Sequence, residues 1–301
     1  MSRPATRQQE IFTLLARHGV MDTNTLMQLF KAAPKSRSTI REALSALHAK
    51  GLIRCGTLKL GGSPSRYWHI ANDKASIKRV LAITGLGLEQ IRIKSCHWSQ
   101  FPHENLCTLF EASIQRHCPS ISVLREGSNG FKNLPEHLLC EQIIESGYMP
   151  DLCLGIPFIH GDSDQFYHLK KWIAVEIDRT MRSHLRLAQR MNIYTRHTAF
   201  NGLLYLMPEE SSRRTLSKIY NHRKAATSPR IEGANQTFLA SGCIQKSLCK
   251  PSSFTVHCNE NETSLHNWLA MIGATEFHQR DELFLKFSDT RMGNLLKEEG
   301  P

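Results

Sequence analysis

The chain has 301 residues, of which 41% are apolar, and it carries a formal net charge of +11. This length predicts two or three domains with ordinary packed cores. No apolar run approaches the roughly 18 residues that a membrane-spanning helix requires, and the N-terminus lacks the apolar stretch of a signal peptide. Its nine cysteines are scattered, which is typical of reduced thiols rather than of a disulfide framework. We therefore expect a soluble, cytoplasmic protein.

The positive charge is concentrated at one end of the chain. Residues 1–80 contain 14 Lys and Arg side chains but only four Asp and Glu side chains, whereas the remainder has 24 basic and 23 acidic residues. An excess of this kind is typical of a module that contacts the phosphates of nucleic acid. A basic surface without a partner is the alternative interpretation.

The first seventy residues show three helical patterns followed by a hairpin pattern. Apolar residues recur at helical spacing in three segments, which are 7–17, 22–30 and 36–50. Two segments with alternating apolar residues follow, 52–60 and 66–70, on either side of the turn residues 61–64. Three helices followed by a hairpin predict a winged helix-turn-helix domain over residues 1–72.

The third of these helices is expected to contact DNA. In helix-turn-helix proteins the N-terminal residues of the recognition helix face the base edges in the major groove. The polar and basic residues at that place are Lys35, Ser36, Arg37, Ser38, Thr39 and Arg41. On the hairpin, Lys59 and Arg66 are expected to hold phosphates. A winged helix used for protein contacts is the alternative, which the charge of the third helix disfavours.

The remaining chain divides into three predicted segments. Residues 73–100 are interpreted as a linker with one short helix, because glycines interrupt the apolar pattern. Residues 101–225 are interpreted as one domain, with helices at 104–116 and 181–196 and strands at 120–126, 152–156, 172–175 and 200–207. This order predicts an α+β or α/β domain with a mixed β-sheet flanked by helices. Residues 226–301 are interpreted as a C-terminal extension, either a cap or a docking segment, with a loop at 221–236, a helix at 263–272 and a strand at 282–287.

Two acidic side chains stand at the ends of neighbouring predicted strands. Asp151 begins one strand, and Glu176 ends the next. If the strands pair as a hairpin, the two carboxylates and the carbonyl of Ile177 form an oxygen site suited to Mg²⁺ or Mn²⁺. Such an ion activates water and holds a phosphodiester. Ordinary surface pairing of Glu176, Asp178 and Arg179 is the alternative.

The helix that follows the acids carries three arginines at a regular spacing. Arg182, Arg186 and Arg190 repeat every four residues and are therefore expected to share one face, whereas Leu187 and Met191 face the core. A basic stripe beside a metal pocket is suited to holding a DNA backbone. A solvated helix face without a partner is the alternative.

Short stretches in this region carry a family resemblance. They are Met149-Pro150-Asp151, Val175-Glu176-Ile177-Asp178-Arg179-Thr180, the arginine-rich helix that ends at Tyr194, and His103 ahead of the first helix. Together they resemble the PD-(D/E)xK nuclease pattern and, more closely, the replication-relaxation family that includes the MobC-type plasmid relaxases. The resemblance covers roughly residues 5–220 and implies a restriction-endonuclease-like domain behind the winged helix.

The resemblance implies a relaxase that binds the transfer origin of a plasmid and nicks one strand of the double-stranded DNA to start conjugative mobilisation. It implies that Asp151 and Glu176 ligate the metal beside Asp178 and Arg179, and that an auxiliary mobilisation protein and a coupling protein are partners. The family pattern expects a lysine where this chain has Asp178, and that lysine normally steadies developing charge. The departure favours an alternative, which is a non-catalytic DNA-binding regulator of replication or transcription with a degenerate nuclease-like domain. The intact pair of Asp151 and Glu176 favours the metal-dependent endonuclease, which is the leading hypothesis. A restriction or defence nuclease shares the acids but not their context.

The group that would attack the phosphodiester is a separate question. A tyrosine nucleophile requires an exposed and activated hydroxyl. Tyr194 and Tyr205 are candidates only because they follow the acids in the chain, and we expect both to be structural. A metal-activated water is therefore the simpler nucleophile.

Overall fold

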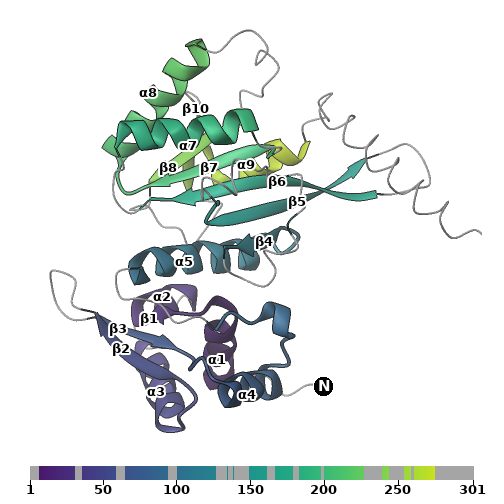
Figure 1. The fold of residues 1–301 in the computed structure, drawn as a ribbon. Coiled ribbons are helices and arrows are strands. Elements are labelled where there is room, and N and C mark those ends of the chain that lie inside the picture. Colours follow the sequence, from purple (N-terminus) through teal and green to yellow (C-terminus); the bar gives the residue numbers. More distant parts are fainter. Residues whose placement is uncertain are drawn as a thin grey trace, which may run out of the picture.

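The computed structural model describes most of the chain (Figure 1). The described residues are 7–30, 36–58, 65–93, 100–126, 149–160, 167–178, 183–197, 200–226, 239–243, 254–258 and 261–274, with Leu134 and Leu138. Several predictions lie outside them, namely those on Lys35, Lys59, Arg179, Arg182, the strand at 282–287 and the side chains of Ser36 and Arg37.

The N-terminal domain has the predicted order of three helices and a hairpin. Its elements are α1 (Arg7–His18), α2 (Thr23–Leu29), α3 (Ser36–Ala49), β2 (Arg54–Leu58) and β3 (Ser65–His69). A short strand, β1 (Met21–Asp22), pairs with β3 and completes a sheet of order β1-β3-β2. Sequence periodicity misses β1 because two residues are too few to show alternation. Asp22 also caps α2, since its Oδ1 accepts a hydrogen bond of 2.6 Å from the backbone N of Thr25.

The segment predicted as a linker is packed against the N-terminal domain. It contains α4 (Lys74–Thr84) and the 3₁₀ helix η1 (Leu88–Gln90). Val80 of α4 is fully buried, and the backbone N of Arg92 donates to the carbonyl of Ala16 on α1 at 2.8 Å. The structure therefore differs from a free linker over residues 73–93. Gly85 ends α4 in the left-handed conformation, with φ 68°, so this glycine marks a helix end rather than a flexible joint.

The second domain is built on a mixed, seven-stranded sheet of order β10-β9-β8-β7-β6-β5-β4. The strands are β4 (Ser122–Arg125), β5 (Leu152–His160), β6 (Tyr167–Ile177), β7 (Gly202–Met207), β8 (Leu239–Cys243), β9 (Thr255–Cys258) and β10 (Asn261–Ser264). The helices are α5 (Phe101–His117), α7 (His184–His197), α8 (Glu210–Ala226) and α9 (Leu265–Ala274). Strands β4, β5 and β6 form an antiparallel meander, and β6, β7 and β8 run parallel. The predicted fold class, a mixed sheet flanked by helices behind a helix-turn-helix domain, is confirmed.

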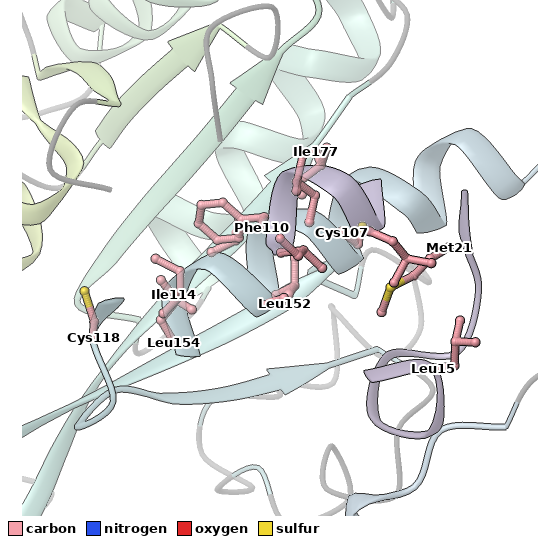
Figure 2. Packing of buried hydrophobic residues seen from close by; sticks show 14 of the residues in the cluster. Leu15, Met21, Cys107, Phe110, Ile114, Cys118, Leu152, Leu154 and Ile177 are labelled. Atoms are coloured by element: carbon pink, nitrogen blue, oxygen red, sulfur yellow. The ribbon is translucent and has the colours of Figure 1, made fainter. Parts of the chain in front are cut away.

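The two faces of this sheet bury different sets of side chains. Alternation along β5 sends Leu152 and Leu154 toward α5 and α9, and sends Cys153 toward α7 and α8. The core on the α5 face continues into the N-terminal domain, as Figure 2 shows for Leu15 and Met21 beside the side chains of α5 and the sheet. Helix α5 therefore lies between the helix-turn-helix domain and the sheet (Figure 1).

The C-terminal part of the described chain belongs to the sheet. Strand β8 pairs with β7, and α9 packs on the α5 face, where the Lys171 ammonium donates to the carbonyl of Ile272 at 3.1 Å. The described residues 239–243, 254–258 and 261–274 thus contribute to the core, in contrast to the extension expected after residue 226. Helix α9 confirms the predicted helix, whereas α8 overlaps the predicted loop at 221–236 because its sequence is mostly polar. No helix of the described residues is both long and apolar enough to cross a membrane.

Candidate nucleic-acid interface and acidic site

Helix α3 presents a polar, exposed face on the N-terminal domain. Ile40, Leu44 and Leu47 are buried against the other helices. The exposed side includes Ser38, Thr39 and Arg41, which are predicted DNA contacts. Figure 1 shows α3 on the side of the molecule away from the large sheet. The helical period therefore leaves this face of α3 open to a groove of DNA.

The hairpin beside α3 is held in place by its own strand pairing and by α2. Strands β2 and β3 are antiparallel, with Thr57 opposite Arg66, and Arg66 is exposed. Trp68 of β3 donates its indole N–H to Thr23 Oγ1 at 3.0 Å. Arg66 is thus on a strand with a defined position relative to the helix-turn-helix, as a phosphate contact requires.

Polar contacts connect the helix-turn-helix to α5. The Asn105 side chain accepts from the backbone N of Asp22 at 3.2 Å and donates to Thr25 Oγ1 at 2.8 Å. Because both partners flank the start of α2, these bonds fix the orientation of the N-terminal domain on the sheet domain. Any DNA bound by α3 is consequently held in a defined orientation relative to the sheet.

Buried charges reinforce the same junction. Arg125 of β4 pairs with Glu104 at 2.7 Å and with Glu111 at 3.3 Å, and His18 of α1 pairs with Glu111 at 3.1 Å. Arg92 also pairs with Glu104, at 2.9 Å. Burial acts to raise the pKa of Glu111, but His18 and Arg125 outweigh it and lower this pKa from 4.5 to about 2. These charges hold α1, α5 and β4 together.

The strand ends that carry the predicted metal ligands do lie side by side. Leu152 is paired with Val175 in the antiparallel β5–β6 ladder, so Asp151 and Glu176 occupy adjoining strand ends. Asp151 Oδ2 accepts a hydrogen bond of 2.7 Å from the backbone N of Ile177. The predicted hairpin is therefore confirmed.

The two carboxylates nevertheless engage opposite layers of the domain. Asp151 Oδ1 lies 3.0 Å from Nε2 of His103 on α5. Glu176 lies 2.8 Å from Arg190 on α7 and also accepts a hydrogen bond from the Tyr194 hydroxyl. Since α5 and α7 cover different faces of the sheet, the acids are directed to different faces.

Glu176 and Arg190 form an ion pair inside the protein. Glu176 is 0% exposed and Arg190 is 6% exposed. Burial raises the pKa of Glu176 above its ordinary value, against the lowering effect of Arg190. Arg190 is therefore not on the exposed stripe that the spacing predicted, while Arg186 is exposed.

The remaining predicted catalytic acid is also paired internally. Asp178 Oδ2 accepts from the Tyr205 hydroxyl at 2.8 Å, and both residues are buried. Burial raises the pKa of Tyr205 and of Tyr194, because it penalises the charged phenolate. Both tyrosines thus occupy structural positions, as expected.

A different set of potential metal ligands comes together at the junction. Within the described ranges, His103, Cys107 and Asp151 form the one group of three whose donor atoms all lie within 4.8 Å of one another. Although burial acts to lower it, hydrogen bonds to Asp151 and Cys107 raise the pKa of His103 to about 11, whereas burial raises the pKa of Cys107. Sequence reasoning named His103 only for its place ahead of a helix. The four-residue spacing of a histidine and a cysteine was the available signal.

The fold and the exposed face of α3 define a helix-turn-helix DNA-binding domain. Residues 7–56 match the family model of the DeoR-like helix-turn-helix domain. The matched range spans α1, α2, α3 and the beginning of β2. Comparison with curated proteins and with solved structures finds no significant match. The chain thus carries a DeoR-like DNA-binding domain at its N-terminus, and nothing in these comparisons extends to the sheet domain.

Proposed function

We propose that this protein binds double-stranded DNA sequence-specifically and regulates replication or transcription without cleaving its target. The observation that carries this proposal is the exposed face of α3, where Ser38, Thr39 and Arg41 are open to solvent on a helix-turn-helix. Hydroxyl and guanidinium groups at this place on a recognition helix reach base edges in the major groove. The surplus positive charge of residues 1–80 supplies the phosphate attraction that such binding needs.

The pairing of the acids supports a non-catalytic role. Metal-dependent cleavage needs carboxylates that converge on one ion and leave a coordination position open to the phosphodiester. Glu176 is enclosed by Arg190 and Tyr194, and Asp178 is bonded to Tyr205. A guanidinium at 2.8 Å already neutralises the Glu176 carboxylate, so a cation would have to displace it.

A relaxase-type nickase is the second candidate, and the placement of two of the predicted acids favours it. Helix α5, the β4–β5–β6 meander, α7 and the parallel strand β7 follow one another along the chain. Asp151 and Glu176 stand at adjoining strand ends in that arrangement. On this candidate reading, Mg²⁺ or Mn²⁺ would have to draw Glu176 away from Arg190 when DNA from a transfer origin binds.

Selection of duplexes by the full chain tests the first proposal. A pool of randomised double-stranded DNA is bound, recovered and sequenced over several rounds at near-physiological salt. We expect one motif to be enriched, because base contacts from α3 discriminate among sequences. Recovery of a pool that remains random after these rounds would contradict sequence-specific binding.

A nicking assay separates the two candidates. Supercoiled plasmid carrying the selected motif or a candidate transfer origin is incubated with the wild type or Asp151→Asn, with Mg²⁺, Mn²⁺ or chelator, and then with protease to reveal attached protein. The regulator proposal predicts no metal-dependent open circles with either protein. Nicking by the wild type that Asp151→Asn abolishes would establish the nickase instead.

A further inference from the structure

Three side chains of different chemistry meet where α5 crosses the end of β5. His103 and Cys107 are one turn apart on α5, and Asp151 directly precedes β5. His103 Nε2 lies 3.0 Å from Asp151 Oδ1 and 3.6 Å from Cys107 Sγ. We propose that His103, Cys107 and Asp151 form a binding site for a divalent cation of the zinc class, which joins the first helix of the sheet domain to its central hairpin.

The separations between the donor atoms fit one shared ion. Zinc in proteins is bound at ~2.0 Å by histidine nitrogen, ~2.3 Å by cysteine sulfur and ~2.0–2.2 Å by carboxylate oxygen. Tetrahedral angles then separate nitrogen and oxygen by about 3.3 Å, and sulfur and nitrogen by about 3.6 Å. The observed distances of 3.0 Å and 3.6 Å differ from these values by a few tenths of an ångström at most. Two of the three separations therefore match a shared ion, and the third, between the sulfur and the carboxylate oxygen, is at most 4.8 Å, against about 3.6 Å around zinc.

The chemistry of the donors selects the class of ion. An imidazole, a thiolate and one carboxylate suit Zn²⁺ and similar transition-metal ions. Mg²⁺ prefers oxygen ligands throughout and is disfavoured by sulfur. This site consequently differs in metal from a magnesium site that would pair Asp151 with Glu176 across the strand ends, and the two sites have only Asp151 in common.

Neighbouring groups already hold the ligands in position. Asp151 Oδ2 is occupied by the backbone N of Ile177 at 2.7 Å, which directs the other oxygen toward α5. Partners of this kind orient ligating carboxylates in metal sites. The positive charge of Arg125 beside Cys107 is balanced by Glu104 and Glu111, so it does not oppose a cation strongly.

The site has access to solvent and an open coordination position. Cys107 is buried, whereas 31% of the His103 side chain is exposed. Three protein ligands leave a fourth position for water. Because the Cys107 thiol and the His103 imidazolium must each lose a proton to ligate, binding releases two protons at neutral pH. Occupancy stabilises the contact between α5 and β5.

Zinc titration of the reduced full chain, stripped of metal beforehand, tests the proposal. Zn²⁺ is titrated in competition with a chromophoric chelator for the wild type, Cys107→Ser and His103→Ala. The matched controls are Cys118→Ser and His117→Ala, which change a cysteine and a histidine at the other end of α5. We expect the wild type and both controls to bind one equivalent of Zn²⁺ tightly. The two site variants should bind Zn²⁺ more than about 100-fold more weakly, because losing an outer-shell partner alone costs about 10–100-fold.

Cobalt substitution gives a readout that does not depend on the affinity of a variant. Wild type loaded with Co²⁺ is expected to show a thiolate-to-metal charge-transfer band, which Cys107→Ser lacks and Cys118→Ser retains. Absence of that band from the wild type, or zinc binding by Cys107→Ser equal to that of the wild type, would overturn the proposal. Circular dichroism of each metal-free variant establishes that it is folded. DNA binding is measured separately, so either proposal can fail alone.

Discussion

The recognition face of α3 and the acidic end of the large sheet differ in how their polar groups are satisfied. Ser38, Thr39 and Arg41 are exposed. Glu176 and Asp178 are buried, and each has a partner inside the protein. Groups of the first kind are accessible to a ligand, whereas groups of the second kind contribute to the fold. Arginine therefore has different roles according to burial, as the exposed Arg41 and the buried Arg190 show.

The largest effect is expected from removing the partner of Glu176. Arg190→Met leaves a buried carboxylate without its counter-charge, and should lower the free energy of unfolding by about 3–5 kcal/mol. Arg186→Met changes an exposed arginine on the same helix and should alter it by less than about 0.5 kcal/mol. Urea denaturation followed by circular dichroism measures both.

A double variant sharpens that result. Glu176→Gln combined with Arg190→Met removes both charges, while the glutamine carbonyl still accepts from Tyr194. It should recover part of the stability lost in Arg190→Met. If Arg190→Met and Arg186→Met prove equally stable, the buried pair does not stabilise the sheet domain.

The next largest effect is expected at low pH, which should weaken the junction between the two domains. The pKa of Glu111 is lowered in the folded protein from 4.5 to about 2, so its contribution is present above pH 4.5 and is lost as the pH falls through about 2. At ~1.4 kcal/mol per pH unit, that contribution is about 3 kcal/mol. Wild type should therefore be more stable than Glu111→Gln at neutral pH, and the difference should vanish near pH 2. A stability difference that stays constant over this range would contradict the assignment.

Smaller effects are expected at the exposed face. Arg41→Ala should weaken binding to the selected duplex by about 1–3 kcal/mol if the guanidinium contacts a base, with unchanged stability. Arg79→Ala, an exposed arginine on α4, is the matched control and should bind as the wild type does. Equilibrium fluorescence anisotropy at constant salt provides the comparison. Equal losses in the two variants would indicate a general charge effect instead of a contact by α3.

The smallest effect is expected on the hairpin. Arg66→Ala should weaken binding to selected and unrelated duplexes alike, because phosphate contacts carry no sequence information. The slope of log affinity against log salt concentration should fall by about 0.9, the value for one phosphate contact. A loss confined to the selected duplex would assign Arg66 to base recognition.

Much of the fold could be predicted because local patterns determine it. The helices of the N-terminal domain follow from the helical spacing of their apolar residues. The β5–β6 hairpin follows from two apolar strands that are consecutive in the sequence. Strand β8 could not be placed beside β7, since a parallel pairing across a long connection leaves no periodic signal. Helix α8 was missed because its polar sequence shows few inward residues such as Leu216.

The acidic site shows that the pairing of two strands does not determine the direction of the side chains at their ends. Pairing placed Asp151 beside Glu176, but the side chains of these two residues are directed to α5 and α7. The arginine stripe failed for a related reason, since a four-residue step on a helix of 3.6 residues per turn drifts by about 40°. One such step from the exposed Arg186 turns Arg190 toward the side of α7 that carries Met191 and Tyr194, which are buried.

The specificity ratio of the wild type is the most direct test of the central claim. Affinities for the selected duplex and for a scrambled duplex of equal length and composition are measured at the same near-physiological salt concentration. A protein that reads bases through α3 should bind the selected duplex at least about 10³-fold more tightly. Equal affinities for the two duplexes would contradict the account.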